Sequence, residues 1–376
     1  MIPRMLEHAI QKRLSDHKVI VLYGPHRAGK TTLLKKLFAG KDGVLFLNGD
    51  ESEVRAIFSD QNSQRLASII GSHTTVVIDE AQRIDNIGLT LKLIHDSMDH
   101  VKLICSGSSS FLLARSLAEP LTGRKWEFLL HPFSFEELAH HQGLLSELQA
   151  RELRLIYGSY PEVTLSPEDG RALLVELVTS YLYKDILEFE LLRKSSKVDD
   201  LLKALALQLG SEVSLNELSS LTGLDVKTVD RYLNLLEQSF VIFRLPSFAR
   251  NVRNEIKRGR KIYFVDNGVP NTVLSTFTPL EHRSDTGPLW ENYLVSERRK
   301  YLSNHNISAH MYFWRTHSQQ EIDYIEERDG ALHAYEFKRN AHKRAKIPSS
   351  FTEAYPSATQ TIITGENYEQ FLLGKI

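Results

Sequence analysis

Residues 24–31, GPHRAGKT, match the pattern G-x-x-x-x-G-K-[ST] at every fixed position. The two glycines let the backbone curl so that several N–H groups face one anion, and the positive end of the following helix points at the same place. Lys30 would reach the β- and γ-phosphates of ATP, and the Thr31 hydroxyl would bind Mg²⁺. The residues of this stretch expected around the nucleotide are Gly24, Pro25, His26, Arg27, Ala28, Gly29, Lys30, Thr31 and Thr32.

The sequence on either side of this stretch supports a phosphate site. Residues 19–23, VIVLY, are typical of a buried strand, and residues 32–37 continue with helical character. An ordinary turn between a strand and a helix is the alternative. The complete motif, with a strand before it and a helix after it, favours phosphate binding.

Two adjacent acids, Asp79 and Glu80, end the apolar segment TTVVIDE. In this position Asp79 would hold Mg²⁺, directly or through water, and Glu80 would orient and deprotonate the attacking water. Two acids after a strand could also cap a helix, and the phosphate loop upstream favours the catalytic interpretation.

Two further residues are candidates for contact with the γ-phosphate. Ser106, with Ser108 as second choice, follows the apolar segment VKLIC, although Ser-Gly-Ser-Ser is also ordinary turn chemistry. Arg124 lies just before another apolar segment. In ring-forming ATPases an arginine of the neighbouring subunit stabilises charge on the γ-phosphate, which contributes on the order of 10³ to 10⁵ in rate. Pairing of Arg124 with a surface acid is the alternative.

A second set of candidates lies near the C-terminus. Asp329-Gly330 separates two alternating segments and predicts a two-residue hairpin turn. Counting outward from this turn places Asp323 opposite Glu336, with β-carbons roughly 4.5 to 5.5 Å apart. A divalent cation between these acids would offset their repulsion, and Lys338 would stabilise developing negative charge. A solvated sheet face is the alternative.

The spacing of Asp323, Glu336 and Lys338 also resembles the PD-(D/E)xK pattern of nucleases. The resemblance implies one more acid on the preceding helix, within GPLWENYLVSERRKYL. Glu291 is the first choice for this acid and Glu297 the second. The resemblance further implies Mg²⁺ or Mn²⁺ at Asp323 and Glu336. Trp314 and the cations Lys338, Arg339, Lys343, Arg344 and Lys346 could flank a bound strand, although Trp314 is equally suited to a core.

Elements that alternate between strand and helix must position the first set of residues. Apolar segments at residues 43–47, 75–78, 101–105 and 126–130 predict strands, and the patterns at residues 3–13, 63–70 and 87–98 predict helices. Such alternation predicts a parallel sheet covered on both faces, hence an α/β fold.

The middle of the chain predicts a helix-turn-helix. Ser214 and Glu217 fit a capping box. Apolar side chains then follow at helical spacing on an inner face: Leu215, Leu218, Leu221, Val226, Val229, Leu233 and Leu236. The outer face offers Lys227, Thr228, Asp230, Arg231 and Asn234 to DNA, and a basic run follows at Arg250, Arg253, Lys257, Arg258, Arg260 and Lys261. Asp230 is unfavourable beside DNA, so a packing role is the alternative.

Composition sets broader limits on the protein. The chain has 376 residues, 42% hydrophobic and 25% charged, which predicts a globular protein of two or three domains. The 46 basic and 47 acidic residues nearly cancel, so overall charge does not indicate nucleic acid. The single cysteine, Cys105, suits a reducing cytosol, and no segment is apolar for long enough to span a membrane. We therefore expect a cytoplasmic protein.

The stretches GPHRAGKTTLL, VVIDEAQRI, SGSSSFLLARSLAEPLTGR and HPFSFEEL resemble a group of bacterial and archaeal AAA+ ATPases with a helical, winged-helix and nuclease-like second half. GSYPEV, YLYKDI, YFVDNG and GPLWENY are similar to later signatures of that group. The resemblance covers most of the chain. It implies an AAA+ P-loop domain (residues 1–140), a helical lid or linker (141–205), a winged helix-turn-helix (206–248) and a restriction-endonuclease-like α/β domain (249–376).

Together these features predict an ATPase that uses ATP and Mg²⁺ and is coupled to a Mg²⁺-dependent nuclease-like domain acting on DNA. An arginine finger in trans would require a homo-oligomer, such as a ring. The alternative is an ATP-gated switch or scaffold that binds DNA or a protein without cutting.

Overall fold

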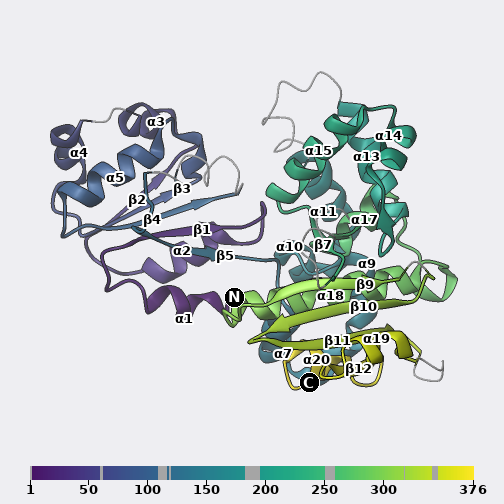
Figure 1. Ribbon diagram of the computed structural model, residues 1–376. Coiled ribbons are helices and arrows are strands. Elements are labelled where there is room, and N and C mark those ends of the chain that lie inside the picture. The colour runs from purple at the N-terminus through teal and green to yellow at the C-terminus, as the bar shows by residue number, and fades with distance from the viewer. Residues whose placement is uncertain are drawn as a thin grey trace. The chain divides into compact units, whose positions relative to one another are not determined.

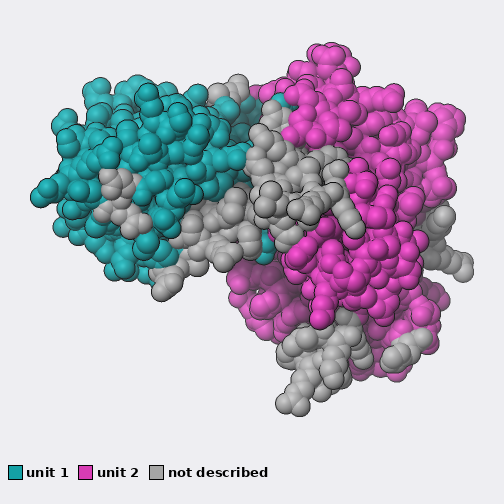
Figure 2. All heavy atoms as spheres, turned by 90° about the horizontal axis from the view of Figure 1, so that it is seen from above, with its two compact units in different colours: residues 1–133, 238–240 teal, residues 134–237, 241–376 magenta. Residues whose placement is uncertain are grey.

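The computed structural model describes residues 2–59, 62–108, 117, 120–182, 195–249, 259–316, 318–340 and 346–376. The chain divides into two compact units, coloured separately in Figure 2. The first unit contains residues 1–133 and 238–240, and the second contains residues 134–237 and 241–376. Each unit is described separately below.

The first unit is built on a parallel sheet of five strands in the order β2-β3-β4-β1-β5 (Figure 1). The predicted strands are confirmed to within two residues at each end. Their bounds are β1 Val19–Tyr23, β2 Val44–Asn48, β3 Thr75–Asp79, β4 Lys102–Gly107 and β5 Lys125–Leu129. Because β1 lies between β4 and β5, all five of its residues are buried.

Helices supply apolar side chains to two separate cores of the first unit. Val19, Val21 and Cys105 belong to one core, whereas Ile20 and Leu22 belong to the other. Alternate side chains of one strand therefore enter different cores, which explains the uninterrupted apolar runs. The helices are α1 Leu6–Gln11, α2 Lys30–Phe38, α3 Ser52–Phe58, α4 Ser63–Ile70 and α5 Ile87–Ser97, with a 3₁₀ turn η1 Ala81–Arg83.

Cys105 lies in the middle of this sheet with no exposed surface. Burial raises the pKa of its thiol to about 12. The thiol is therefore protonated and inaccessible at neutral pH.

The second unit begins with helices. They are α7 Phe135–Gln142, α8 Leu144–Gln149, α9 Arg151–Tyr157, α10 Pro161–Leu165, α11 Gly170–Glu176 and α13 Ser195–Leu207, with η2 Pro167–Asp169 and the π-helical η3 Leu177–Leu182. A capping box starts α7, where Ser134 and Glu137 bond each other's backbone N–H groups.

A helix-turn-helix follows, as predicted, with α14 Leu215–Thr222 and α15 Val226–Gln238. The capping box predicted at Ser214 is wrong: no side chain caps α14, and Glu217 instead accepts a hydrogen bond from Gln208. Leu221 and Val226 were predicted on the inner face but are 60% and 38% exposed, because they flank the turn between the helices.

A three-stranded sheet accompanies these helices in the order β6-β8-β7. Its strands are β6 Glu212–Val213, β7 Ile242–Pro246 and β8 Arg260–Phe264. Both neighbours of β8 are antiparallel to it. The strand after residue 249, β8, therefore belongs to the same sheet as β6 and β7, which precede that residue.

The C-terminal segment forms a four-stranded sheet in the order β12-β11-β10-β9. The predicted hairpin is confirmed: Arg328 pairs with Ala331, and Asp329 and Gly330 have φ of 50° and 78°. The elements are α17 Gly268–Val273, η4 Leu280–His282, α18 Thr286–Asn304, β9 His310–Arg315, β10 Glu321–Arg328, β11 Ala331–Lys338, α19 Ser349–Ala354, β12 Thr359–Thr364 and α20 Tyr368–Leu372.

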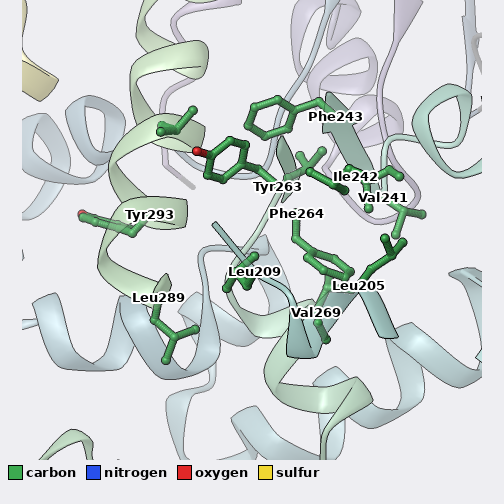
Figure 3. Close-up of a cluster of buried hydrophobic side chains, with 14 of the residues drawn as sticks. Leu205, Leu209, Val241, Ile242, Phe243, Tyr263, Phe264, Val269, Leu289 and Tyr293 are labelled. Atoms are coloured by element: carbon green, nitrogen blue, oxygen red, sulfur yellow. The ribbon is translucent and has the colours of Figure 1, made fainter. Parts of the chain in front are cut away.

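One hydrophobic core joins the helices, the three-stranded sheet and the four-stranded C-terminal sheet of the second unit. Figure 3 shows the part of it where α13, β7, β8, α17 and α18 meet. The labelled side chains are Leu205, Leu209, Val241, Ile242, Phe243, Tyr263, Phe264, Val269, Leu289 and Tyr293.

Three of the sequence signatures meet around Asp266, which is buried beside this core. Its carboxylate accepts hydrogen bonds from the backbone N–H of Ser159 at 2.7 Å and of Gly268 at 2.8 Å. Asn267, the residue after Asp266, accepts a hydrogen bond at 2.7 Å from the side chain of Asn292. GSYPEV, YFVDNG and GPLWENY therefore form one structural junction.

The junction predicts the effect of a change at Gly158. An alanine Cβ there would lie 1.7 Å from Oδ1 of Asp266, at a φ of +72°. We expect Gly158→Ala to lower the free energy of unfolding by roughly 3 kcal/mol. Gly330→Ala is the matched control, because its φ is +78° but its Cβ would meet open space, which costs only about 1 kcal/mol. Guanidinium unfolding measures both, and equal losses would contradict the clash.

None of the helices within the described ranges has both the length and the apolarity to cross a membrane.

Candidate functional site

The phosphate loop connects β1 to α2 and has the backbone that its sequence predicts. Gly29 precedes α2 with a φ of +96°, and a Cβ on Gly24 would lie 2.2 Å from the carbonyl oxygen of Leu130. Lys30 is buried, and its Nζ donates to the carbonyls of Gly24 at 2.9 Å and Pro25 at 3.0 Å. Its ammonium group is therefore held over the loop, where phosphate oxygens would lie.

The candidate magnesium ligands Thr31 and Asp79 meet the candidate γ-phosphate contact Ser106 at the carboxyl ends of three strands. Thr31 follows β1, Asp79 ends β3, and Ser106 lies near the end of β4. The Thr31 hydroxyl donates to Oδ2 of Asp79 at 2.5 Å, and the Ser106 hydroxyl donates to Oδ1. Because a hydroxyl and a carboxylate are oxygen ligands of the kind Mg²⁺ prefers, this cluster fits the ion.

Glu80 lies beside this cluster in a left-handed conformation, with φ of 50°. Its carboxylate accepts a hydrogen bond from Nε2 of Gln82 at 2.5 Å, and the same nitrogen lies 3.0 Å from Oγ of Ser108. Gln82 therefore ties the candidate base to the loop after β4. The signal for Gln82 in the sequence is weak, because it consists only of its place two residues after Glu80.

The remaining candidate residues lie in the loop and in the first turn of α2. Arg27 has a φ of 58°, Ala28 is buried, and Thr32 is exposed. Arg4, which we did not predict, donates to the carbonyl of Ala28 at 2.7 Å. His26 and Pro25 lie at variable positions of the motif.

Arg124 lies at the other end of the sheet from the phosphate loop. It immediately precedes β5, whereas the loop follows the carboxyl end of the parallel strand β1. Its Nε lies 3.1 Å from Oδ1 of Asp96, and both side chains are about 40% exposed. Hydrogen bonds from His95 and then Arg124 lower the pKa of Asp96. Within one chain Arg124 thus pairs with a surface acid, and its role as a finger in trans stays a prediction.

A cavity of about 900 Å³ in the second unit brings together most of the second set of candidates. Glu291 enters it from α18, Asp323 from β10 and Lys338 from β11. The segments after α13 and β12 complete its wall through Gly210 and Glu366. These residues are far apart in the sequence, so the fold creates this site.

Asp323 and Glu336 are neighbours, as the hairpin register predicts. The ladder pairs Tyr324 with Tyr335, and Oδ2 of Asp323 accepts the N–H of Phe337 at 2.8 Å. Burial raises the pKa of Glu336, and the charge of Asp323 raises it further. One oxygen of Glu336 accepts Nζ of Lys338 at 2.7 Å, while the other is buried and has no hydrogen-bond partner among the described residues. An unpaired buried carboxylate oxygen fits a bound cation.

Of the two candidate acids on α18, Glu291 lines the cavity and Glu297 does not. Oε1 of Glu291 accepts Nζ of Lys261 at 2.8 Å and the hydroxyl of Tyr263 at 2.7 Å. Burial raises the pKa of Glu291 to about 7, against the lowering effect of Lys261 and with a further increase from Asp323. Glu297 does not line the cavity and instead binds the N–H of Phe135 and Nζ of Lys300.

Lys261 corrects our interpretation of the basic run. Four of its members, Arg250, Arg253, Lys257 and Arg258, lie outside the described residues. Lys261 is only 1% exposed and binds both Glu291 and Glu321. Burial alone would lower its pKa, but Glu291, Glu321 and Asp323 raise it. It is therefore an internal cation of the acidic site and cannot contact a phosphate backbone from the surface.

Two other surface predictions change. Trp314 is buried against Phe351, so the core interpretation holds and it offers no exposed face for stacking. Asp230 lies 3.6 Å from Arg244 and 3.9 Å from Arg260, so its charge is partly balanced within the protein. Lys343 and Arg344 lie outside the described residues.

The acidic site offers few side chains that could bind a metal ion. In the described part of the chain, no three Asp, Glu, His or Cys side chains form a group that could hold a metal ion. Any cation there would rest mainly on Asp323 and Glu336, with water or backbone oxygens completing its shell.

The sheet order, the phosphate loop and the Thr31–Asp79–Ser106 cluster define a P-loop ATPase domain in the first unit. A family model described as an AAA domain matches residues 16–139. Residues 148–280 and 286–375 match two domains of unknown function, DUF8612 and DUF4143.

Proteins from distant organisms are similar to most of this chain. An uncharacterised protein of Methanocaldococcus jannaschii is 24% identical over 346 residues, which cover 86% of this chain and 75% of that protein. One from Haemophilus influenzae is 24% identical over 394 residues, covering 97% and 93%. A solved Walker-type ATPase of Pyrococcus abyssi is 17% identical with a TM-score of 0.49, covering 73% of this chain and 96% of that one.

Proposed function

We propose that this protein hydrolyses ATP with Mg²⁺ and couples nucleotide binding to a metal-dependent nuclease-like site that acts on DNA. In the first unit, Lys30 binds the phosphates, Thr31 and Asp79 hold Mg²⁺, and Glu80 orients water toward the γ-phosphate. Gln82 restrains Glu80 through the hydrogen bond described above. The AAA match over residues 16–139 supports this half of the proposal.

The observation that carries the second half is the meeting of Glu291, Asp323 and Lys338 in one cavity, with Glu336 adjacent. A bound Mg²⁺ or Mn²⁺ would polarise a phosphodiester and activate water. Asp323 and Glu336 would hold the ion, and Lys338 would stabilise negative charge developing on the phosphate. Arg151 and Arg339 line the same cavity and suit a polyanionic substrate.

A second candidate function is an ATP-gated switch or scaffold whose nuclease-like half binds DNA or a protein without cutting. The absence of a three-ligand metal group among the described residues favours it. We also propose a cytoplasmic homo-oligomer, in which Arg124 of one subunit reaches the nucleotide of the next.

A cleavage assay separates the two functions. Linear, supercoiled and branched DNA are incubated with the full chain and ATP in Mg²⁺, in Mn²⁺ or in EDTA. The nuclease proposal expects cleavage that requires the metal ion. DNA binding that persists in EDTA, together with intact DNA in every metal ion, would support the switch instead.

A further inference from the structure

Four acids at or beside the C-terminal cavity form two pairs. Glu291 and Glu321 are bridged by Lys261, whose Nζ lies 2.8 Å from Oε1 of Glu291 and also contacts Oε1 of Glu321. Asp323 and Glu336 form the second pair, next to each other on the hairpin. Within the described part of the chain, a buried carboxylate oxygen without a hydrogen-bond partner remains in the second pair, Oε2 of Glu336.

Lys261 is a built-in part of this arrangement. It is 1% exposed on β8, and the backbone of that strand is fixed by pairing with Glu212 on one side and Leu245 on the other. Tyr263, two residues along the strand, donates to the same oxygen of Glu291 at 2.7 Å. An ammonium group that joins two carboxylates places positive charge between them, as a divalent ion does when it bridges two carboxylates.

The charges of these four acids and the two lysines paired with them are consistent with one divalent ion. The four acids, Glu291, Glu321, Asp323 and Glu336, exceed the two lysines, Lys261 and Lys338, by two charges. Arg315 approaches Glu321 at 3.6 Å but also pairs with Glu212 at 3.4 Å, so it is shared with an acid outside the group. Arg151, Arg339 and Glu366 line the cavity without ion pairs to these acids in the described part of the chain.

We propose that this site binds a single divalent cation at Asp323 and Glu336, and that Lys261 takes the place of a second. The inference rests on the proposed metal site and adds its stoichiometry. Lys261 is a positioning residue: it holds one oxygen of Glu291 and neutralises that acid, while it touches neither the ion nor the substrate. Removing its charge would leave Glu291 and Glu321 free to bind another cation.

Metal counting tests this inference without any cleavage reaction. Mn²⁺ is titrated into the metal-free full chain without nucleotide, and bound ions are counted by electron paramagnetic resonance of the free Mn²⁺. Asp323→Asn serves as the reference, because it removes the C-terminal site and leaves the ATP site intact. We expect wild type to bind one more ion than Asp323→Asn, Lys261→Met to bind two more, and Lys261→Arg to bind one more.

The outcomes distinguish the two proposals. Equal counts for wild type and Asp323→Asn would remove the metal site itself, and with it the nuclease half of the proposed function. Relative to Asp323→Asn, two additional ions in wild type would contradict the role of Lys261, and so would only one additional ion in a folded Lys261→Met. Neither result would affect the proposed metal site itself. If a thermal unfolding experiment shows that Lys261→Met is not folded, the wild-type count tests the proposal: one additional ion agrees with it and two contradict it.

Discussion

Lys30→Ala is expected to lower the rate of ATP hydrolysis by about 10²- to 10³-fold, the usual loss when one charge-stabilising group is removed from a reacting site. The Lys30 ammonium group is buried and held by the carbonyls of Gly24 and Pro25, in the loop whose N–H groups would face the phosphates. No other described lysine lies within hydrogen-bond distance of those two carbonyls. Steady-state phosphate release measures the effect.

Lys35→Ala is the matched control for that experiment. Lys35 is on the same helix, α2, but it is exposed to solvent. Its removal should leave turnover within about twofold of wild type, because an exposed charge contributes little. Turnover by Lys30→Ala equal to that of Lys35→Ala would remove the ATPase assignment.

Asp323→Asn is expected to abolish metal-dependent DNA cleavage, with a loss of more than about 10²-fold. Changes to residues that only support a metal ligand already cost 10- to 100-fold, so loss of a ligand's charge should cost more. The substitution keeps the size of the side chain and its acceptor for the N–H of Phe337, so the hairpin should persist. Initial cleavage rates in Mg²⁺ measure the effect.

Glu327→Gln provides the control for Asp323→Asn. It removes one carboxylate charge from the same strand, β10, at a half-buried position that does not line the cavity. Cleavage should remain within about twofold of wild type. An equal fall in the cleavage rate of both variants would mean that the net charge of this strand, rather than the metal site, controls the reaction.

The ATP site could be predicted almost completely from the sequence. Its residues form short local motifs, and in a parallel sheet the carboxyl ends of β1, β3 and β4 must meet at one edge. The structure adds Gln82 and Arg4, whose roles depend on loop conformations that no motif encodes.

The acidic site could be predicted only in part. Asp323 and Glu336 follow from the hairpin, because the register of a two-residue turn is fixed. Lys261 and Glu321 do not, because their contact joins strands β8 and β10, which belong to different sheets and lie far apart in the sequence. In the sequence Lys261 looks like one more cation of an exposed run.

The two capping boxes show a similar limit. Ser134-x-x-Glu137 and Ser214-x-x-Glu217 have the same local pattern, but only the first forms the reciprocal bonds. Glu217 has a competing partner in Gln208, which lies in the turn directly after α13. Tertiary contacts thus decide between two sequences of equal local propensity.

The buried thiol in the middle of the first sheet makes this chain well suited to spectroscopy. Since Cys105 is its only cysteine and is shielded from reagents, a dye or spin label will react only with cysteines introduced at exposed positions. Lys35→Cys and Leu145→Cys would carry one probe on each unit. Energy transfer between the probes would then report whether adding ATP changes their separation, and Cys105 would not have to be replaced.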